Sequence, residues 1–306
     1  MRLLLAALCW SSAAWAEPPE KLADGVYAIL HADATPDWPN GNTLVVVGER
    51  GVLVLDANYL PSAARADIAA IKKLTPRPVR WLVNSHWHYD HNNGNAEYRK
   101  AFPGVEIVAH VETRRLMDAN CARYNRGLGA KSSPELAKFE YAAPTVTFER
   151  ELTIDLGGRE ARVVHLGRGN TPGDTLVHLP RERIVASGDL VVAPVPYAWN
   201  SYPLEWIATL RALRALRPAI LLPGHGPIMR DLRYVEDVEA LLESVVRQVR
   251  ELQETGKTLD EVRAALDLRA FHDRMVAGDA TQEEVWTESI VKALVERAWQ
   301  SVRGGI

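Results

Sequence analysis

Short apolar runs separated by turn residues fill the first three quarters of the chain. Runs rich in Val, Ile and Leu predict β-strands, because these residues pack well on a buried pleated surface. We expect strands at residues 25–30, 44–47, 52–55, 80–83, 105–109, 153–156, 160–166, 175–179, 184–186 and 219–222. Helical spacing of apolar positions predicts helices at residues 62–74, 95–102, 112–124 and 204–216. Strands interleaved with helices are typical of an α/β domain.

The last quarter of the chain has a helical pattern throughout. Residues 235–253 carry an apolar stripe with a period near 3.6 residues, and Thr258 with Glu261 is typical of a capped helix start. Residues 281–284 open a third helix. We expect this tail to cover a flank of the α/β domain. A homodimer interface through these helices, or a lid over a site, is the alternative.

The first sixteen residues have the pattern of a secretory signal. Arg2 precedes the apolar residues 3–8, and Ala14-Trp15-Ala16 is an Ala-x-Ala cleavage site. We therefore expect cleavage after Ala16 and a location in the periplasm or outside the cell. Cys9 leaves with the signal, so Cys121 is the one remaining thiol and no internal disulfide can form. We expect Cys121 to pack within a helix.

Charge and hydropathy exclude two classes of partner. The chain has 36 Lys and Arg against 39 Asp and Glu, for a net charge of −3, and its basic residues form no run. Nucleic-acid binding needs clustered cations, so no nucleic-acid partner is expected. Beyond the signal, no long uncharged stretch predicts stable membrane insertion. The more polar residues 120–144 are expected at the surface, and a small molecule is the expected partner.

Candidate metal ligands cluster where predicted strands end. His86, His88, Asp90 and His91 lie within six residues, directly after an apolar run. Imidazole nitrogen suits zinc, and a neighbouring carboxylate extends such a site toward a second ion. Two more loops follow apolar runs and contain single candidates. These are Asp189 in Ser-Gly-Asp-Leu and His225 in Pro-Gly-His-Gly.

The His-x-His-x-Asp-His pattern resembles the signature of the metallo-β-lactamase-fold hydrolase superfamily, and residues 25–227 fall within the resemblance. The resemblance implies a four-layer α/β/β/α sandwich. The chain would then comprise a signal peptide (1–16), a catalytic domain (17–230) and a helical extension (231–306). It also implies one or two zinc ions, with iron or manganese as alternatives. The implied metal ligands are His86, His88, Asp90, His91, Asp189 and His225.

One position departs from the superfamily pattern. Where members usually carry another His, the loop Gly-Arg-Gly-Asn-Thr-Pro-Gly-Asp places Asn170. An amide oxygen is a poorer zinc ligand than imidazole. His165, five residues upstream, is the alternative third ligand beside His86 and His88. We therefore expect two metal positions of unequal affinity, the tighter one at Asp90, His91, Asp189 and His225.

A metal-activated water would attack an ester, lactone, thioester or amide-type bond. Asp90 would bind metal, orient this water and accept its proton, and Asp56 would support a ligand His from behind. The candidate pocket residues lie on two loops: Tyr197, Trp199, Asn200, Tyr202 and Trp38. Val192 stands where β-lactamases carry a Lys that grips the drug carboxylate, which argues against a β-lactamase proper. That enzyme remains one alternative, and a metal-binding or redox-pathway accessory protein is another.

Overall fold

The structure is a computed structural model that describes residues 18–35, 38–124, 127 and 129–306. Its larger sheet has seven strands in the order β1-β2-β5-β6-β7-β8-β9. The strands are β1 (Glu20–Ala23), β2 (Val26–Ile29), β5 (Thr43–Gly48), β6 (Gly51–Leu55), β7 (Val79–Val83), β8 (Glu106–His110) and β9 (Val146–Phe148). Strands β6 to β9 run parallel, whereas β1, β2, β5 and β6 pair antiparallel.

The second sheet has five strands in chain order. They are β10 (Glu151–Asp155), β11 (Glu160–Val164), β12 (Leu176–Leu179), β13 (Ile184–Ala186) and β14 (Ile220–Leu222). The first four form an antiparallel meander, and β14 pairs parallel to β13. Gly157 and Gly158 join β10 to β11 and have positive φ, which suits glycine. A separate hairpin consists of β3 (Asp33–Thr35) and β4 (Trp38–Pro39).

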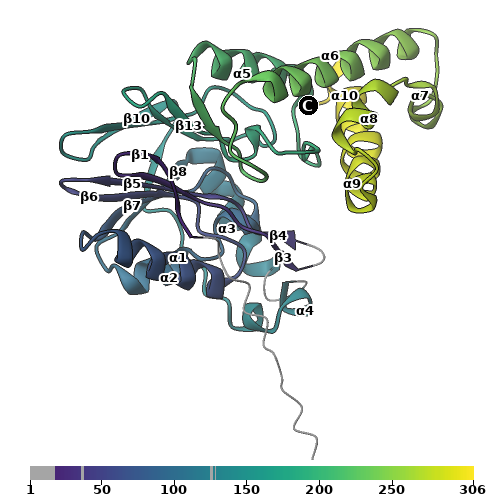
Figure 1. Ribbon diagram of the computed structural model, residues 1–306. Helices are drawn as coiled ribbons and strands as arrows, with labels where there is room; N and C mark the ends of the chain where they lie inside the picture. The colour runs from purple at the N-terminus through teal and green to yellow at the C-terminus, as the bar shows by residue number, and fades with distance from the viewer. Residues whose placement is uncertain (1–17, 36–37, 125–126, 128) are drawn as a thin grey trace, which may run out of the picture.

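Helices cover both outer faces, so the expected four-layer sandwich is confirmed (Figure 1). A central core lies between the sheets and includes Leu44, Val163 and Leu222. On the outer face of the larger sheet pack α1 (Pro61–Leu74) and α2 (Asn95–Ala101). On the outer face of the smaller sheet packs α5 (Pro203–Ala215), with the buried Trp206. Between β8 and β9 lie α3 (Val111–Tyr124), α4 (Ala130–Ser132) and η3 (Pro134–Lys138).

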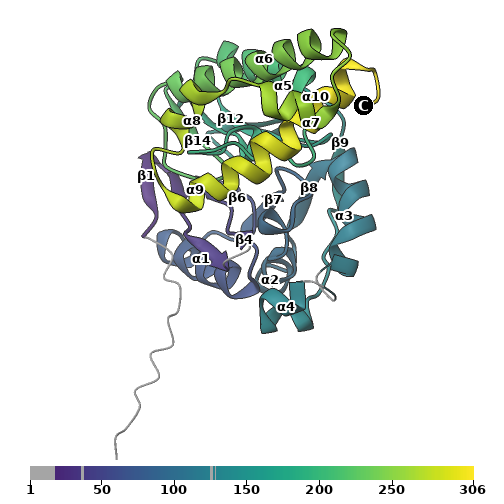
Figure 2. The same ribbon diagram turned by 90° about the vertical axis from the view of Figure 1, so that its right-hand side faces the viewer.

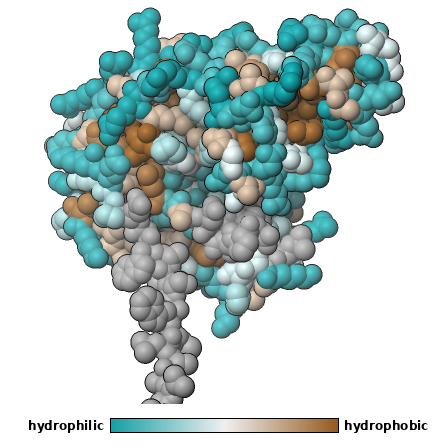
Figure 3. All heavy atoms as spheres, turned by 45° about the vertical axis from the view of Figure 1, so that its right-hand side comes forward, coloured by the Kyte–Doolittle hydropathy of each residue, from teal (hydrophilic) through white to brown (hydrophobic). Residues whose placement is uncertain are grey.

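The C-terminal extension is helical, as expected. It comprises α6 (Arg233–Glu254), α7 (Leu259–Ala265), α8 (Arg269–Met275), α9 (Ala280–Val285), the π-helix η5 (Trp286–Leu294) and α10 (Val295–Val302). The apolar stripe of α6 is buried in one core with α5 and the smaller sheet, so the tail does cover the domain's own flank. Figure 2 shows the helix from α9 to α10 crossing in front of the domain. Figure 3 shows a face that is mostly hydrophilic, with small separate apolar areas.

Four details of the structure bear on expectations from the sequence. The capping box at Thr258 and Glu261 is confirmed, but α8 and the π-helix were not predicted. The segment 120–144 is not simply surface, because Leu136 and Phe139 are buried in a cluster with Cys121. Among the described residues, no helix has both the length and the apolar character needed to cross a membrane. The signal-peptide prediction concerns residues outside the described part of the chain.

Candidate metal centre

Three loops at the ends of parallel strands bring the predicted ligands together. The loop after β7 turns through the short helix η1 (Tyr89–His91), and Asp189 lies in η4 (Gly188–Leu190) after β13. His225 follows β14. Carboxyl ends of parallel strands meet at one edge of a sheet, which is where α/β folds place their sites. All six predicted ligands are buried.

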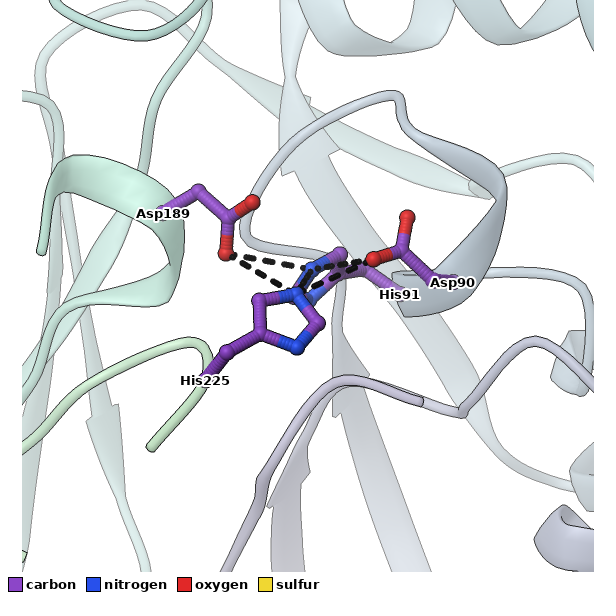
Figure 4. Close-up of side chains that lie close together, drawn as sticks. All are labelled: Asp90, His91, Asp189 and His225. Carbon is purple, nitrogen blue, oxygen red and sulfur yellow. Dashed lines mark hydrogen bonds and ion pairs between the residues drawn. The ribbon is translucent and has the colours of Figure 1, made fainter. Parts of the chain in front are cut away.

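The first cluster contains Asp90, His91, Asp189 and His225 (Figure 4). One donor atom from each residue lies within 4.8 Å of the others. His225 Nε2 lies 3.0 Å from Asp90 Oδ2 and 3.2 Å from His91 Nε2. His91 Nε2 lies 3.2 Å from Asp189 Oδ1. The two imidazoles and two carboxylates therefore point at one common point.

The second cluster contains His86, His88 and Asp189. His86 Nε2 lies 3.0 Å from His88 Nδ1 and 3.6 Å from Asp189 Oδ2. Asp189 thus directs Oδ1 to the first cluster and Oδ2 to the second. A carboxylate shared in this way can bridge two ions.

The buried polar atoms of the site fit bound cations. Asp90 Oδ1, Asp189 Oδ1 and Asn170 Oδ1 are buried and accept no hydrogen bond from the described residues. A buried oxygen without a partner is costly, and so are two imidazole nitrogens facing each other with the same role. A metal ion in the first cluster would satisfy Asp189 Oδ1 and separate the facing nitrogens of His91 and His225. Nitrogen and oxygen donors in this mixture suit zinc.

Asp56 fixes the protonation of two ligand imidazoles. Its Oδ2 lies 2.8 Å from His91 Nδ1, so that nitrogen donates and Nε2 is the nitrogen that faces the first cluster, where a bound cation would take the place of its proton. Ser85 Oγ donates to the same Oδ2 at 2.7 Å and lies 3.0 Å from His86 Nδ1. Ser85 therefore accepts from His86 Nδ1, which leaves His86 Nε2 free for the second cluster. Asp56 supports both clusters from behind.

Asn200 plays the same part for His88. Its Oδ1 lies 2.9 Å from His88 Nε2. An amide oxygen only accepts, so His88 Nε2 carries the proton and Nδ1 faces His86 with its lone pair. The side chain of Asn200, expected from the sequence only as a pocket residue, therefore orients a metal-ligand candidate.

With this geometry established, comparison with known proteins decides the family. The family model of the Metallo-beta-lactamase superfamily matches residues 36–225, more than half of the chain. The chain belongs to the metallo-β-lactamase superfamily.

Three relatives illustrate the range of this superfamily. A linear primary-alkylsulfatase from Pseudomonas sp. is 23% identical over 63% of this chain and 43% of its own length. The α subunit of 2,4-dinitroanisole O-demethylase from Nocardioides sp. is 25% identical over 76% of this chain and 63% of its own length. The solved sec-alkylsulfatase Pisa1 from Pseudomonas sp. has a TM-score of 0.69 at 18% identity, over 92% of this chain and 50% of that chain. The chain thus spans about half the length of such relatives, and the structural likeness concerns the fold alone.

Electrostatics prepares the superfamily's ligand set for a cation. Burial lowers the pKa of both His86 and His88, so these imidazoles stay neutral and keep lone pairs near pH 7. Burial would raise the pKa of Asp90 and Asp189, but the neighbouring imidazoles outweigh it and lower both values. The carboxylates are therefore ionised. His86 and His88 beside ionised carboxylates are thus in the protonation states that metal binding requires. Burial would lower the pKa of His91, but the carboxylates of Asp189, Asp90 and Asp56 outweigh it and raise that pKa, so metal binding at the first cluster would displace a proton from His91.

Asn170 occupies the position of the usual superfamily His. It is buried, and its Nδ2 lies 3.4 Å from the Asp189 carbonyl and 3.5 Å from Asp189 Oδ2. Asp174 holds this loop by accepting from the backbone N–H and the hydroxyl of Thr171. His165 is not an alternative ligand here, because its Nδ1 lies 2.7 Å from the Asp174 carbonyl and its ring stacks on His110 at 4.1 Å. Asn170 thus contacts Asp189, the carboxylate that the two clusters share.

The predicted pocket residues of this superfamily member separate into two groups. Tyr197 lies beside the site, with its ring 5.2 Å from His225 and 5.0 Å from Trp199. Trp199 is 45% exposed. Tyr202 instead contacts the guanidinium groups of Arg168 and Arg297, at 4.0 and 5.0 Å from its ring. Trp38 belongs to β4, and its side chain lies outside the described residues.

The sequence-based reasoning missed a two-residue clamp, Gly41-Asn42. The Gly41 N–H donates to the Asp90 carbonyl at 3.1 Å, and the Asn42 N–H donates to the Gly224 carbonyl at 2.7 Å. Asn42 Nδ2 also donates to the carbonyls of Pro223 and Gly226. This clamp joins the loops of two ligands. The Asn-Gly-Asn sequence signals only a turn, so these long-range contacts were not readable from it.

Proposed function

We propose that this protein is an exported zinc-dependent hydrolase that directs a metal-activated water at an ester, lactone, thioester or amide-type bond. The observation that carries the proposal is the pair of buried ligand clusters joined by Asp189, whose Oδ1 accepts no hydrogen bond from the described residues. Export rests on the signal-like residues 1–16. Membership of the metallo-β-lactamase superfamily supports a hydrolytic reaction.

Zinc bound in these clusters would supply Lewis acidity and lower the pKa of a water molecule toward neutrality. Asp90 Oδ1 is buried, has no hydrogen-bond partner among the described residues and is ionised, so it would orient the attacking water and take up its proton. Asp189 would hold the two ions in register. Asp56 and Asn200 keep the imidazoles in the tautomers that leave one nitrogen free for metal.

The aromatic side chains beside the first cluster favour a substrate with an apolar alkyl or aryl group. Tyr197 lies against His225 and continues to the exposed ring of Trp199, which together form an aromatic surface next to the first cluster. Aromatic side chains bind apolar groups and tolerate a polar edge. One relative is named for alkyl sulfates and another for 2,4-dinitroanisole, and both names agree with such a group.

The β-lactamase alternative is weaker. Val192, at the position of the β-lactamase Lys, is 1% exposed and forms a β-bridge with His225. A buried valine offers no cation to a drug carboxylate. We therefore expect β-lactam turnover to be incidental.

A direct test combines metal content with a substrate panel. We would purify the protein from the periplasm, measure zinc per chain by elemental mass spectrometry, and assay nitrophenyl esters, lactones, thioesters and nitrocefin. Asp90→Asn should lower kcat at least about a hundredfold, because it removes the proton acceptor. Asp155→Asn is the matched control, since that carboxylate is 60% exposed on β10.

The results of this test distinguish the proposed hydrolase from an accessory protein and from a β-lactamase. Ester hydrolysis that depends on Asp90 supports the proposal. If the protein binds zinc but hydrolyses none of these substrates, the hydrolase proposal is wrong and the accessory-protein hypothesis is favoured. Nitrocefin as the preferred substrate favours the β-lactamase reading.

A further inference from the structure

The loop 194–202 carries the pocket residues Tyr197 and Trp199 and the residue Asn200 that orients His88. It runs between η4 and α5 and contains no strand, so few of its backbone groups find partners in a sheet. Tyr234 of the C-terminal extension donates its hydroxyl to the Pro194 carbonyl at the start of the loop, and two side chains nearer the end of the extension contact the rest of the loop. The extension lies beyond residues 36–225, which the family model matches.

Ser289 is the first of these side chains. It is fully buried in the π-helix η5. Its hydroxyl donates to the Pro196 carbonyl at 2.7 Å and accepts from the Ala198 N–H at 2.9 Å. The Ser289 hydroxyl therefore pairs with a backbone carbonyl just before Tyr197 and with a backbone N–H just after it.

Arg297 in α10 is the second. Its Nε donates to the Ser201 carbonyl at 2.6 Å, and its Nη2 donates to the Asn200 carbonyl at 3.4 Å. Its guanidinium lies 5.0 Å from the ring of Tyr202. Arg297 forms no ion pair with the carboxylates of the described residues, whereas most neighbouring arginines of the extension do. Its contacts are thus concentrated on the loop.

These contacts connect the extension to the second metal cluster in three steps. Arg297 holds the backbone of Asn200, the Asn200 side chain contacts His88 Nε2 at 2.9 Å, and His88 Nδ1 faces His86. Ser289 holds the backbone around Tyr197, whose ring contacts His225. The extension therefore acts on both clusters through one loop.

We propose that Ser289 and Arg297 are positioning residues of the metal centre. They fix the loop 194–202 so that Asn200 orients His88 and the aromatic pair Tyr197 and Trp199 faces the substrate. The part of this inference that concerns substrate selectivity rests on the proposed hydrolase function. The part that concerns metal affinity can be measured without any enzymatic activity. It gives the extension a role in metal affinity and in selectivity for apolar substrates.

Arg297→Gln and Ser289→Ala test the proposal, with Arg303→Gln as the matched control. Arg303 directly follows α10, and its side chain is exposed and lies 5.7 Å from the ring of Trp299. Titration of the metal-free protein with Co²⁺, followed by its visible absorption, reports each cluster. We expect about tenfold weaker binding at the His86 and His88 cluster in both variants, and no change in the control.

A double-mutant cycle then tests the route. If Arg297 acts through Asn200, Arg297→Gln should have little further effect on cobalt affinity in an Asn200→Ala background. Additive effects would overturn that route. In parallel, both variants should lose more kcat/KM for nitrophenyl hexanoate than for nitrophenyl acetate. Displacement of Tyr197 and Trp199 removes apolar contacts that the long hexanoyl chain uses and the short acetyl group does not.

The outcomes remain distinguishable from failure of the proposed function. Wild-type protein that binds cobalt but hydrolyses no ester refutes the hydrolase, and the cobalt titrations still judge the positioning role. Variants that fold, melt at lower temperature and bind cobalt like wild type would overturn the positioning role. If Ser289→Ala fails to fold, Arg297→Gln alone decides, since its side chain is partly exposed and can be replaced without a cavity.

Discussion

Replacing Asp56 by Asn is the sharpest test of how the metal ligands are held. Asp56 has φ of 68°, a left-handed conformation that Asn also tolerates, so the backbone should survive the change. The carboxylate accepts from the Ser85 N–H, the Ser85 hydroxyl and His91 Nδ1, at 2.7, 2.7 and 2.8 Å. An amide offers one oxygen in place of two, so its NH₂ group must face at least one of these donors.

The magnitude follows from that conflict. If the NH₂ group of the new Asn faces His91, Nδ1 becomes an acceptor and the proton moves to Nε2, where the metal should bind. Loss of such an outer partner costs about 10- to 100-fold in metal affinity, or about 1.4–2.8 kcal/mol. The Ser85 hydroxyl also loses its acceptor, which frees it from holding His86. We therefore expect weaker zinc binding at both clusters.

Zinc competition with a chromophoric chelator measures both affinities, and circular dichroism checks the fold. Asp155→Asn serves again as the control, because Asp155 is exposed and remote from the ligands. Asp56→Asn protein that remains folded and binds zinc as tightly as wild type at both clusters would refute the tautomer argument. Weaker zinc binding at the first cluster alone would show that Asp56 does not act on His86 through Ser85.

Three further predictions can be checked with the same preparations. Asn170→His should tighten the second cluster about tenfold or more, seen as a rise in zinc per chain, because imidazole is the better ligand. Gly41→Ala should weaken zinc binding at least about tenfold, because its Cβ would lie 2.5 Å from ring atoms of His91. Burial lowers the pKa of His110 and His165 from 6.5, so the stability they contribute is lost as pH falls below 6.5. Metal-free protein should thus melt at a lower temperature at pH 5 than at pH 7, with a smaller difference in His165→Phe.

Each of these predictions has a result that contradicts it. Zinc content unchanged by Asn170→His would mean that this position does not reach the metals. Gly104→Ala is the control for Gly41→Ala, since nothing lies within 4 Å of its added Cβ, and equal effects of both would contradict the steric argument. Identical melting profiles of wild type and His165→Phe across this pH range would remove the histidine pair as a source of acid sensitivity.

Most of the fold and the loops that hold the candidate ligands could be predicted from the sequence, because both depend on local residue patterns. Apolar runs marked most of the strands of the two sheets, and His86, Asp189 and His225 each stand directly after one of these runs. The four-layer arrangement came from resemblance, since alternation of strands and helices alone indicates only an α/β class. Edge strands such as β1 and β9 were missed because they are short and half exposed.

What the sequence could not predict is how the ligands are oriented. Asn42 and Ser289 act through hydrogen bonds to backbone atoms, and backbone partners leave no residue pattern. Arg297 sits on an amphipathic helix where a cation looks like ordinary solvent-facing charge. Its partners lie almost a hundred residues earlier in the chain. Such long-range contacts become visible only when the loop 194–202 is placed against the extension.

The two ligand clusters draw their residues from both halves of the sandwich. His86, His88, Asp90 and His91 follow a strand of the seven-stranded sheet, whereas Asp189 and His225 follow strands of the five-stranded sheet. An ion bound here is therefore a cross-link between two layers that otherwise adhere through apolar packing. Free zinc at a hundred times its Kd would add about 2.7 kcal/mol to the free energy of unfolding. Zinc supply in the surrounding medium would then govern how long the molecule resists proteases, apart from any effect on turnover.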